Sequence, residues 1–145
     1  MSLAYAYPKS RFEPATLVDL TSKAERERLS RSALTAFFKL ATAWTLRDDD
    51  ARELLGGLSS SSFYDWKKNP DRLLEVDRIT RISYLLGIYK SLHILYGDKL
   101  ADEWVALPNK NPVFAGRTPL SQMLAGGLLA MQTVRKLLDA RRGGL

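Results

Sequence analysis

Residues 56–68, GGLSSSSFYDWKK, combine hydroxyl and ammonium groups at spacings that suit contact with nucleic acid. With Ser59 as the N-cap of a helix, its hydroxyl can accept a hydrogen bond from the first turn, and Leu58 and Phe63 occupy the two positions of a hydrophobic staple. The opposite face of that helix carries small hydroxyls and cations, which can reach phosphates and base edges. We therefore predict a DNA-binding surface made by Ser59, Ser60, Ser61, Tyr64, Lys67 and Lys68.

Groups suited to catalysis or metal binding are sparse elsewhere in the sequence. The absence of cysteine rules out disulfides, thiolate nucleophiles and thiolate metal ligands. The aspartates at 48–50 would point in different directions on a helix, so stabilisation of a helix start explains them better than a divalent-cation site. His93, the only histidine, has no ligand partner near it in the sequence and is expected to be a packed or half-exposed helical residue. We therefore expect no enzymatic activity, no metal site and no cofactor.

Apolar residues recur at three- and four-residue steps through most of the chain, and no stretch alternates with a period of two. This pattern predicts an all-α protein, preceded by an irregular arm over residues 1–22. Within the helix expected at 98–106, Leu100 and Trp104 should face inward. Further helices are expected over about 23–45, over about eight residues that end before Gly56, after the Ser59 cap, and over about 74–96. Thr118 is expected to cap a short helix that starts at Pro119 and ends at the glycines at 126–127, and a last helix is expected over about 128–142.

The short helix before Gly56, the glycine turn and the helix after Ser59 together form a helix-turn-helix pattern, in which the second helix fits a major groove. A plain helical hairpin in a small bundle is the alternative explanation of the same pattern. Residues 1–109 hold 16 basic and 15 acidic side chains, so one copy would bind DNA weakly. We therefore expect a homodimer, which would double the contacts.

The net charge of +6 and the pI near 9.7 indicate an anionic partner. The excess lies in residues 110–145, which hold six basic side chains and one acidic side chain, Asp139. Cations near a helix C-terminus complement its dipole, but this explains only part of the excess. No apolar run approaches the roughly 18–20 residues of a membrane span, and no secretion signal is present, so we expect no membrane association and a cytoplasmic location.

Residues 81–127 and the TVRKLLDARRGG stretch that follows them resemble the antitoxins of the Xre/MbcA/ParS group, which are partners of RES-domain toxins. The resemblance rests on LLGIYKSLHILYGD, on Trp104, on PNKNPVFAGRTPLSQML and on TVRKLLDARRGG. The N-terminal half is similar to the Xre-like helix-turn-helix of the same group. One departure is GGLSSSSFYDW, whose extra glycine and serine run differ from the shorter turns of the group.

The resemblance implies a type II antitoxin with an arm at 1–22, a helix-turn-helix DNA-binding domain at 23–97 and a small helical toxin-binding domain at 98–145. Such antitoxins neutralise an NAD-consuming toxin by occluding its active site. They also bind operator DNA as autorepressors, and they act as dimers in higher-order complexes with toxin. The toxin-binding residues that the resemblance implies are Arg117, Arg135, Lys136, Arg141, Arg142, Gly143, Gly144 and Leu145.

Two alternatives remain open on the sequence. One is a stand-alone helix-turn-helix transcriptional regulator whose C-terminal part serves only for dimerisation or for binding a small ligand. The other is a protein-interaction module whose helix-turn-helix no longer binds DNA.

Overall fold

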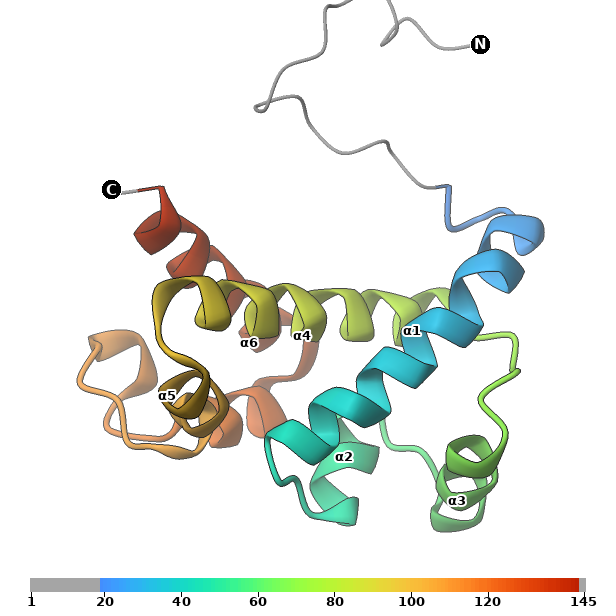
Figure 1. Ribbon diagram of the computed structural model, residues 1–145, viewed down its shortest axis with the longest axis horizontal. Coiled ribbons are helices and arrows are strands. Elements are labelled where there is room, and N and C mark those ends of the chain that lie inside the picture. Colours follow the sequence, from blue (N-terminus) through green and yellow to red (C-terminus); the bar gives the residue numbers. More distant parts are fainter. Residues whose placement is uncertain (1–18, 144–145) are drawn as a thin grey trace, which may run out of the picture.

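The computed structural model describes residues 19–143, which form helices and connecting loops (Figure 1). No strand occurs in this part of the chain, which confirms the predicted all-α fold. Of the predicted arm over 1–22, residues 1–18 lie outside the described part of the chain. The elements of residues 19–143 are α1 (Lys23–Ala43), α2 (Asp48–Leu54), α3 (Ser60–Lys68), α4 (Val76–Leu95), α5 (Asp98–Glu103), the 3₁₀ turns η2 (Trp104–Ala106) and η3 (Pro112–Phe114), and α6 (Pro119–Arg142).

Side-chain caps define where several helices begin. Ser22 Oγ accepts from Glu25 N at 3.3 Å at the start of α1, and Ser59 Oγ accepts from Ser62 N at 3.2 Å at the start of α3. Thr118 Oγ1 accepts from Ser121 N at 3.1 Å, with a proline at the first position of α6. The predicted caps of α3 and α6 are therefore confirmed, since each hydroxyl satisfies an amide that the helix itself leaves unpaired.

Helix α4 is the centre of the hydrophobic core. It packs against α1 along one part of its length and against α6 along another. Its inward residues Ile82, Leu85, Ile88 and Leu92 are fully buried. The core from α1 to α6 is one connected cluster. The helix-turn-helix part and the C-terminal part therefore share one core, which α4 spans (Figure 1).

Helix α6 contains the break that the two adjacent glycines predict. Gly127 has φ 61 and ψ −141, so the helix interrupts there and resumes in a new direction. A positive φ of this kind favours glycine, because other residues would strain the backbone. The two helices predicted around this point are thus the two arms of α6.

One inward residue was predicted wrongly. Leu100 is 43% exposed, whereas Ala101 and Val105 are fully buried beside Trp104. Helix α5 ends at Glu103 and continues as the tighter η2 turn, in which residues three apart align. The buried edge therefore passes through Ala101 and Trp104 and leaves Leu100 outside. None of the helices in residues 19–143 has the length and hydropathy of a membrane span.

Candidate nucleic-acid and partner interfaces

The turn between α2 and α3 is held by backbone conformation and by one arginine. Gly56 and Gly57 have φ values of 100 and 83, in the region that favours glycine. The side chain of Arg52 donates from Nε to Leu58 O at 2.8 Å, and its own carbonyl accepts from Gly57 N at 3.0 Å. Arg52 therefore holds the turn through both its side chain and its backbone carbonyl, and these two hydrogen bonds set the direction in which α3 leaves the turn.

The inner face of α3 is anchored by aromatic side chains. Phe63 is 2% exposed and packs edge-to-face against Phe38 of α1, with ring centroids 5.4 Å apart. Trp66 lies under the guanidinium of Arg78, 5.6 Å from its ring centroid. Leu58, at the other position of the staple, is also buried. These contacts fix α3 to the core by one face and leave the opposite face open.

All six residues predicted to bind DNA are exposed. Lys67 differs from the other five in that it lines a hollow beside Phe38 of α1. The hydroxyl of Ser59 accepts the capping hydrogen bond of α3, so this side chain has a structural role. Ser60 and Ser61 lie in the first turn, and Lys67 and Lys68 lie in the last. Small hydroxyl donors and cations are therefore presented along one helix, as contact with phosphates and base edges requires.

Tyr64 is tied to α2, a contact that the sequence did not indicate. Its hydroxyl donates to Asp48 Oδ2 at 2.7 Å, while 47% of the residue remains exposed. The hydrogen bond to Asp48 and the charge of that carboxylate raise the pKa of Tyr64. Neighbouring Asp49 pairs with Arg52 at 3.2 Å and with Arg47 at 3.8 Å. Carboxylates of α2 thus border the open face of α3, which gives this surface mixed charge.

Three of the cations predicted to bind toxin pack onto α4 instead of extending freely. Arg135 pairs with Asp139 at 3.2 Å, and its guanidinium occupies the space that a Cβ on Gly87 would need. Arg141 Nη1 donates to the Tyr96 hydroxyl at 3.0 Å. Arg142 Nη1 donates to Ser91 Oγ at 3.2 Å. The last turns of α6 are therefore held against the C-terminal half of α4, whose dipole favours cations.

The other residues predicted to bind toxin divide into three sets. Lys136, on α6, is exposed. Arg117 is also exposed, in a loop anchored by the edge-to-face contact between Phe114 and Trp104 at 6.0 Å. Gly143 is the C-cap residue of α6. Gly144 and Leu145 lie outside the described residues.

A second polar cluster, which the spacing of residues in the sequence did not indicate, lies around His93. Its Nδ1 lies 3.1 Å from Asp98 Oδ1, and its Nε2 lies 2.9 Å from Asp102 Oδ1. Its ring packs against that of Tyr89 at a tilt of 39°, with centroids 4.2 Å apart. Burial lowers the pKa of His93, but the hydrogen bonds to Asp98 and Asp102 outweigh it and raise the pKa above its ordinary value. The cluster ties α4 to α5.

Metal binding finds no support in the part of the chain that the structure describes, where no three His, Cys, Asp or Glu side chains converge. The two carboxylates beside His93 approach opposite nitrogens of its ring, so they cannot share one ion with it. This arrangement is an ion-pair cluster that holds helices together.

The two candidate interfaces lie far apart. Figure 1 shows α3 at one end of the molecule and the C-terminal end of α6 at the other, with α4 between them. The two surfaces therefore do not overlap.

Comparison with known proteins assigns each end to a family. Residues 22–87 match the antitoxin Xre-like helix-turn-helix domain, and residues 91–144 match the antitoxin Xre/MbcA/ParS C-terminal toxin-binding domain. A curated relative, "Uncharacterized protein y4oB" of Sinorhizobium fredii (strain NBRC 101917 / NGR234), is 41% identical over 112 residues, which cover 77% of this chain and 84% of the relative. No solved structure matches the chain significantly.

Proposed function

Because the chain belongs to the Xre/MbcA/ParS antitoxin family, we propose that it is the antitoxin of a type II pair whose toxin is a RES-domain, NAD-consuming protein. It binds the toxin through its C-terminal part and covers the active site. It also binds its own operator through α3 and represses transcription of the pair. The chain acts in the cytoplasm by binding and performs no chemistry.

The observation that carries this proposal is the placement of two family domains at opposite ends of one core. The helix-turn-helix match contains α2 and α3, and the toxin-binding match contains α5 and α6. A protein that both represses a promoter and holds a toxin needs two such surfaces. Helix α4, which both parts share, would hold the two surfaces at a fixed distance and orientation.

The toxin-binding surface that we propose comprises the exposed Arg117 and Lys136, the end of α6 and the residues that follow it. Two roles follow for Arg135, Arg141 and Arg142. Their contacts with α4 hold the end of α6 in place, and their charge adds to the cationic surface that meets the toxin. An acidic rim on the toxin would complement this charge.

Operator binding requires more than one copy of α3. Carboxylates of α2 border its open face, so the attraction of one protomer for DNA is modest. A homodimer would place two α3 helices on successive half-sites and double the favourable contacts. Complexes with toxin would then contain at least two antitoxin chains.

Two variants separate the proposed activities. Truncation after Leu138 removes Arg141 and Arg142 but keeps the buried end of the core, so growth rescue from the toxin should fail while operator band shifts persist. Tyr64→Ala combined with Lys68→Ala should abolish the operator band shift and leave growth rescue intact. Intact rescue by the truncated chain would refute the role of the tail, and a persistent shift with the double variant would refute the role of α3.

A further inference from the structure

One face of α1 carries a row of cations and hydroxyls. We call this row the α1 stripe; its members are Arg28, Arg31, Ser32, Thr35, Lys39 and Thr42. These residues recur at three- and four-residue steps, which places them on one side of the helix. Thr35 is half-buried, and the other members are exposed. The stripe is therefore open to a partner along most of its length.

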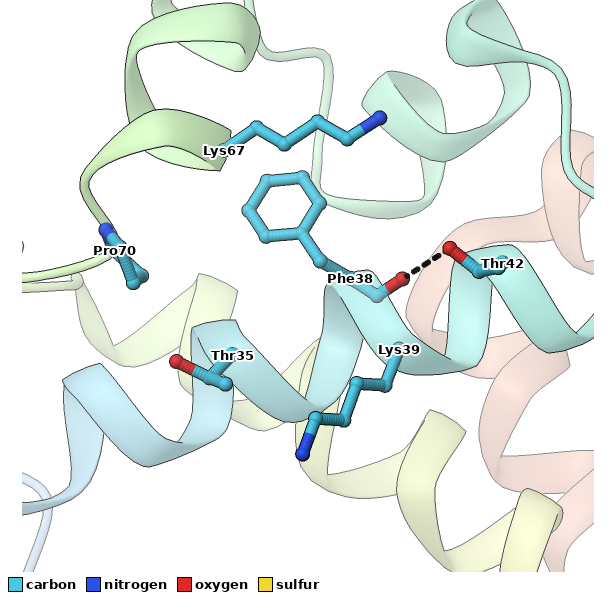
Figure 2. Close-up of a pocket in the computed structure, with 6 residues that line it drawn as sticks. All are labelled: Thr35, Phe38, Lys39, Thr42, Lys67 and Pro70. Atoms are coloured by element: carbon cyan, nitrogen blue, oxygen red, sulfur yellow. Dashed lines mark hydrogen bonds between the residues drawn. The ribbon is translucent and has the colours of Figure 1, made fainter.

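Two hollows lie along the stripe. One, of about 480 Å³, is lined by the N-terminal part of the stripe from Arg28 to Lys39. The second, of about 400 Å³, is lined by Thr35, Phe38, Lys39 and Thr42 from α1 together with Lys67 and Pro70 (Figure 2). In Figure 2 the side chain of Lys67 extends from α3 over the ring of Phe38. Thr35 and Lys39 line both hollows, so the two form one continuous surface that runs from α1 to α3.

The charge of this surface has one sign. No carboxylate lines either hollow. Arg28 pairs with Glu25 at 2.7 Å, outside the hollows. Among the described residues, the ion pairs leave Arg31, Lys39 and Lys67 without a carboxylate within 4.0 Å. Three cations without partners, interspersed with hydroxyl donors, form a site for an extended anion.

We propose that the α1 stripe binds backbone phosphates of the DNA whose groove receives α3. This inference rests on the proposed operator binding, and it adds a second contact that positions the duplex without reading its sequence. Lys67 belongs to both surfaces, so a duplex in contact with the last turn of α3 lies beside the stripe. Arg31 and Lys39 lie about 12 Å apart along the helix axis, a span that covers more than one phosphate of a strand. Cations and hydroxyls are the side chains that contact phosphates most often.

The stripe also supplies the positive charge that the open face of α3 lacks. Carboxylates of α2 border α3, whereas the carboxylate of Glu25 pairs with Arg28 at the N-terminal end of the stripe and no carboxylate lines the hollows. Sequence-independent attraction would therefore come mainly from α1, and α3 would supply discrimination among sequences.

The test is Arg31→Gln combined with Lys39→Gln in the full-length protein. Binding is measured by fluorescence anisotropy on a duplex from the region upstream of the gene and on a shuffled duplex, over about 50–200 mM salt. The expected loss is on the order of tenfold or more at about 0.1 M salt, similar for both duplexes, and the salt slope should fall by about two per protomer. The matched control is Lys90→Gln combined with Lys99→Gln, which removes the same charge from exposed positions on α4 and α5.

The outcomes separate this inference from the proposed function. If the wild type binds its duplex specifically and the variant keeps the same affinity and the same salt slope, the role of the stripe is overturned. The proposed operator binding is then left intact. Equal losses of DNA affinity in the variant and the control would mean that only the net charge of the protein matters. That result would also overturn the role of the stripe. Absence of binding by the wild type to any duplex would refute both proposals. Loss of toxin neutralisation with unchanged DNA binding would assign the stripe to an acidic protein surface instead.

Discussion

The hydroxyl of Tyr64 on α3 donates a hydrogen bond of 2.7 Å to Asp48 Oδ2 at the first residue of α2. This contact joins the two helices of the helix-turn-helix on their solvent side. It also places a negative charge beside the face that is proposed to approach DNA. Asp48 therefore supports the orientation of Tyr64 and weakens the attraction of that face for phosphates.

Replacement of Asp48 by Asn should raise operator affinity several-fold. The amide oxygen can still accept from Tyr64, while the removal of a carboxylate near the phosphates lowers the repulsion, which is largest at low salt. Band shifts or anisotropy at about 50 mM and 200 mM salt measure this effect. Asp71→Asn, at an exposed position after α3, is the matched control. Weaker binding by Asp48→Asn would mean that its charge is needed to hold Tyr64 in place.

Charge reversal at Arg117 and Lys136 should impair toxin neutralisation without unfolding the protein. Both side chains are exposed, so the free energy of unfolding should change by no more than about 0.5 kcal/mol. Growth rescue and thermal unfolding are measured side by side. Arg31→Glu with Lys39→Glu on α1 makes the same change of charge far from the end of α6. Full rescue by the Arg117→Glu, Lys136→Glu variant would remove these two residues from the toxin-binding surface.

Ser30 should contribute to stability through a hydrogen bond across the core. Its Oγ accepts from Leu74 N at 2.9 Å, and both residues are 1% exposed. Ser30→Ala leaves that amide buried without a partner, which should lower the free energy of unfolding by about 1–3 kcal/mol. Urea denaturation followed by circular dichroism provides the value. Ser32→Ala, at an exposed position of the same helix, is the control, and equal values for the two variants would contradict the prediction.

His93 should stabilise the contact between α4 and α5 more at low pH than at high pH. Its folded-state pKa lies above the ordinary value of 6.5 because the hydrogen bonds to Asp98 and Asp102 outweigh the effect of burial. The stabilisation is therefore complete below about pH 6.5, where the unfolded chain is also protonated, and it disappears as pH rises through the folded-state pKa.

His93→Gln tests this dependence. Thermal unfolding should show a loss of about 1 kcal/mol at pH 5.5, because hydrogen bonds to charged groups disappear, and a smaller loss at pH 9. Lys90→Gln, on the exposed side of the same helix, should show no such difference. A loss for His93→Gln that grows as pH rises would mean that the neutral ring is the stabilising form.

Local sequence rules predicted much of the fold. Ser59 and Thr118 were recognised as caps because a hydroxyl at a helix start satisfies amides only a few residues away. The glycines at 126–127 predict a break because glycine tolerates a positive φ, and Gly127 adopts one. The three- and four-residue period likewise predicts a helix over about 74–96, where α4 lies. Each of these features depends on residues within one or two turns of one another.

Contacts across the turns could not be predicted in the same way. The hydrogen bond from Tyr64 to Asp48 spans 16 positions and depends on the angle at which α3 leaves the glycine turn. His93 meets Asp98 and Asp102 only because the chain reverses after α4. Arg135 packs over Gly87 because α6 resumes at a particular angle after Gly127. These relations follow from tertiary packing, which spacing along the sequence does not determine.

The most direct test of the proposed function is co-expression of the full chain with the affinity-tagged RES-domain toxin of the proposed pair. We expect growth to be restored and the untagged chain to elute with the toxin as a stable complex in size-exclusion chromatography. Persistent growth arrest, with the toxin eluting alone although the chain is expressed and folded, would contradict the assignment of this protein as its antitoxin.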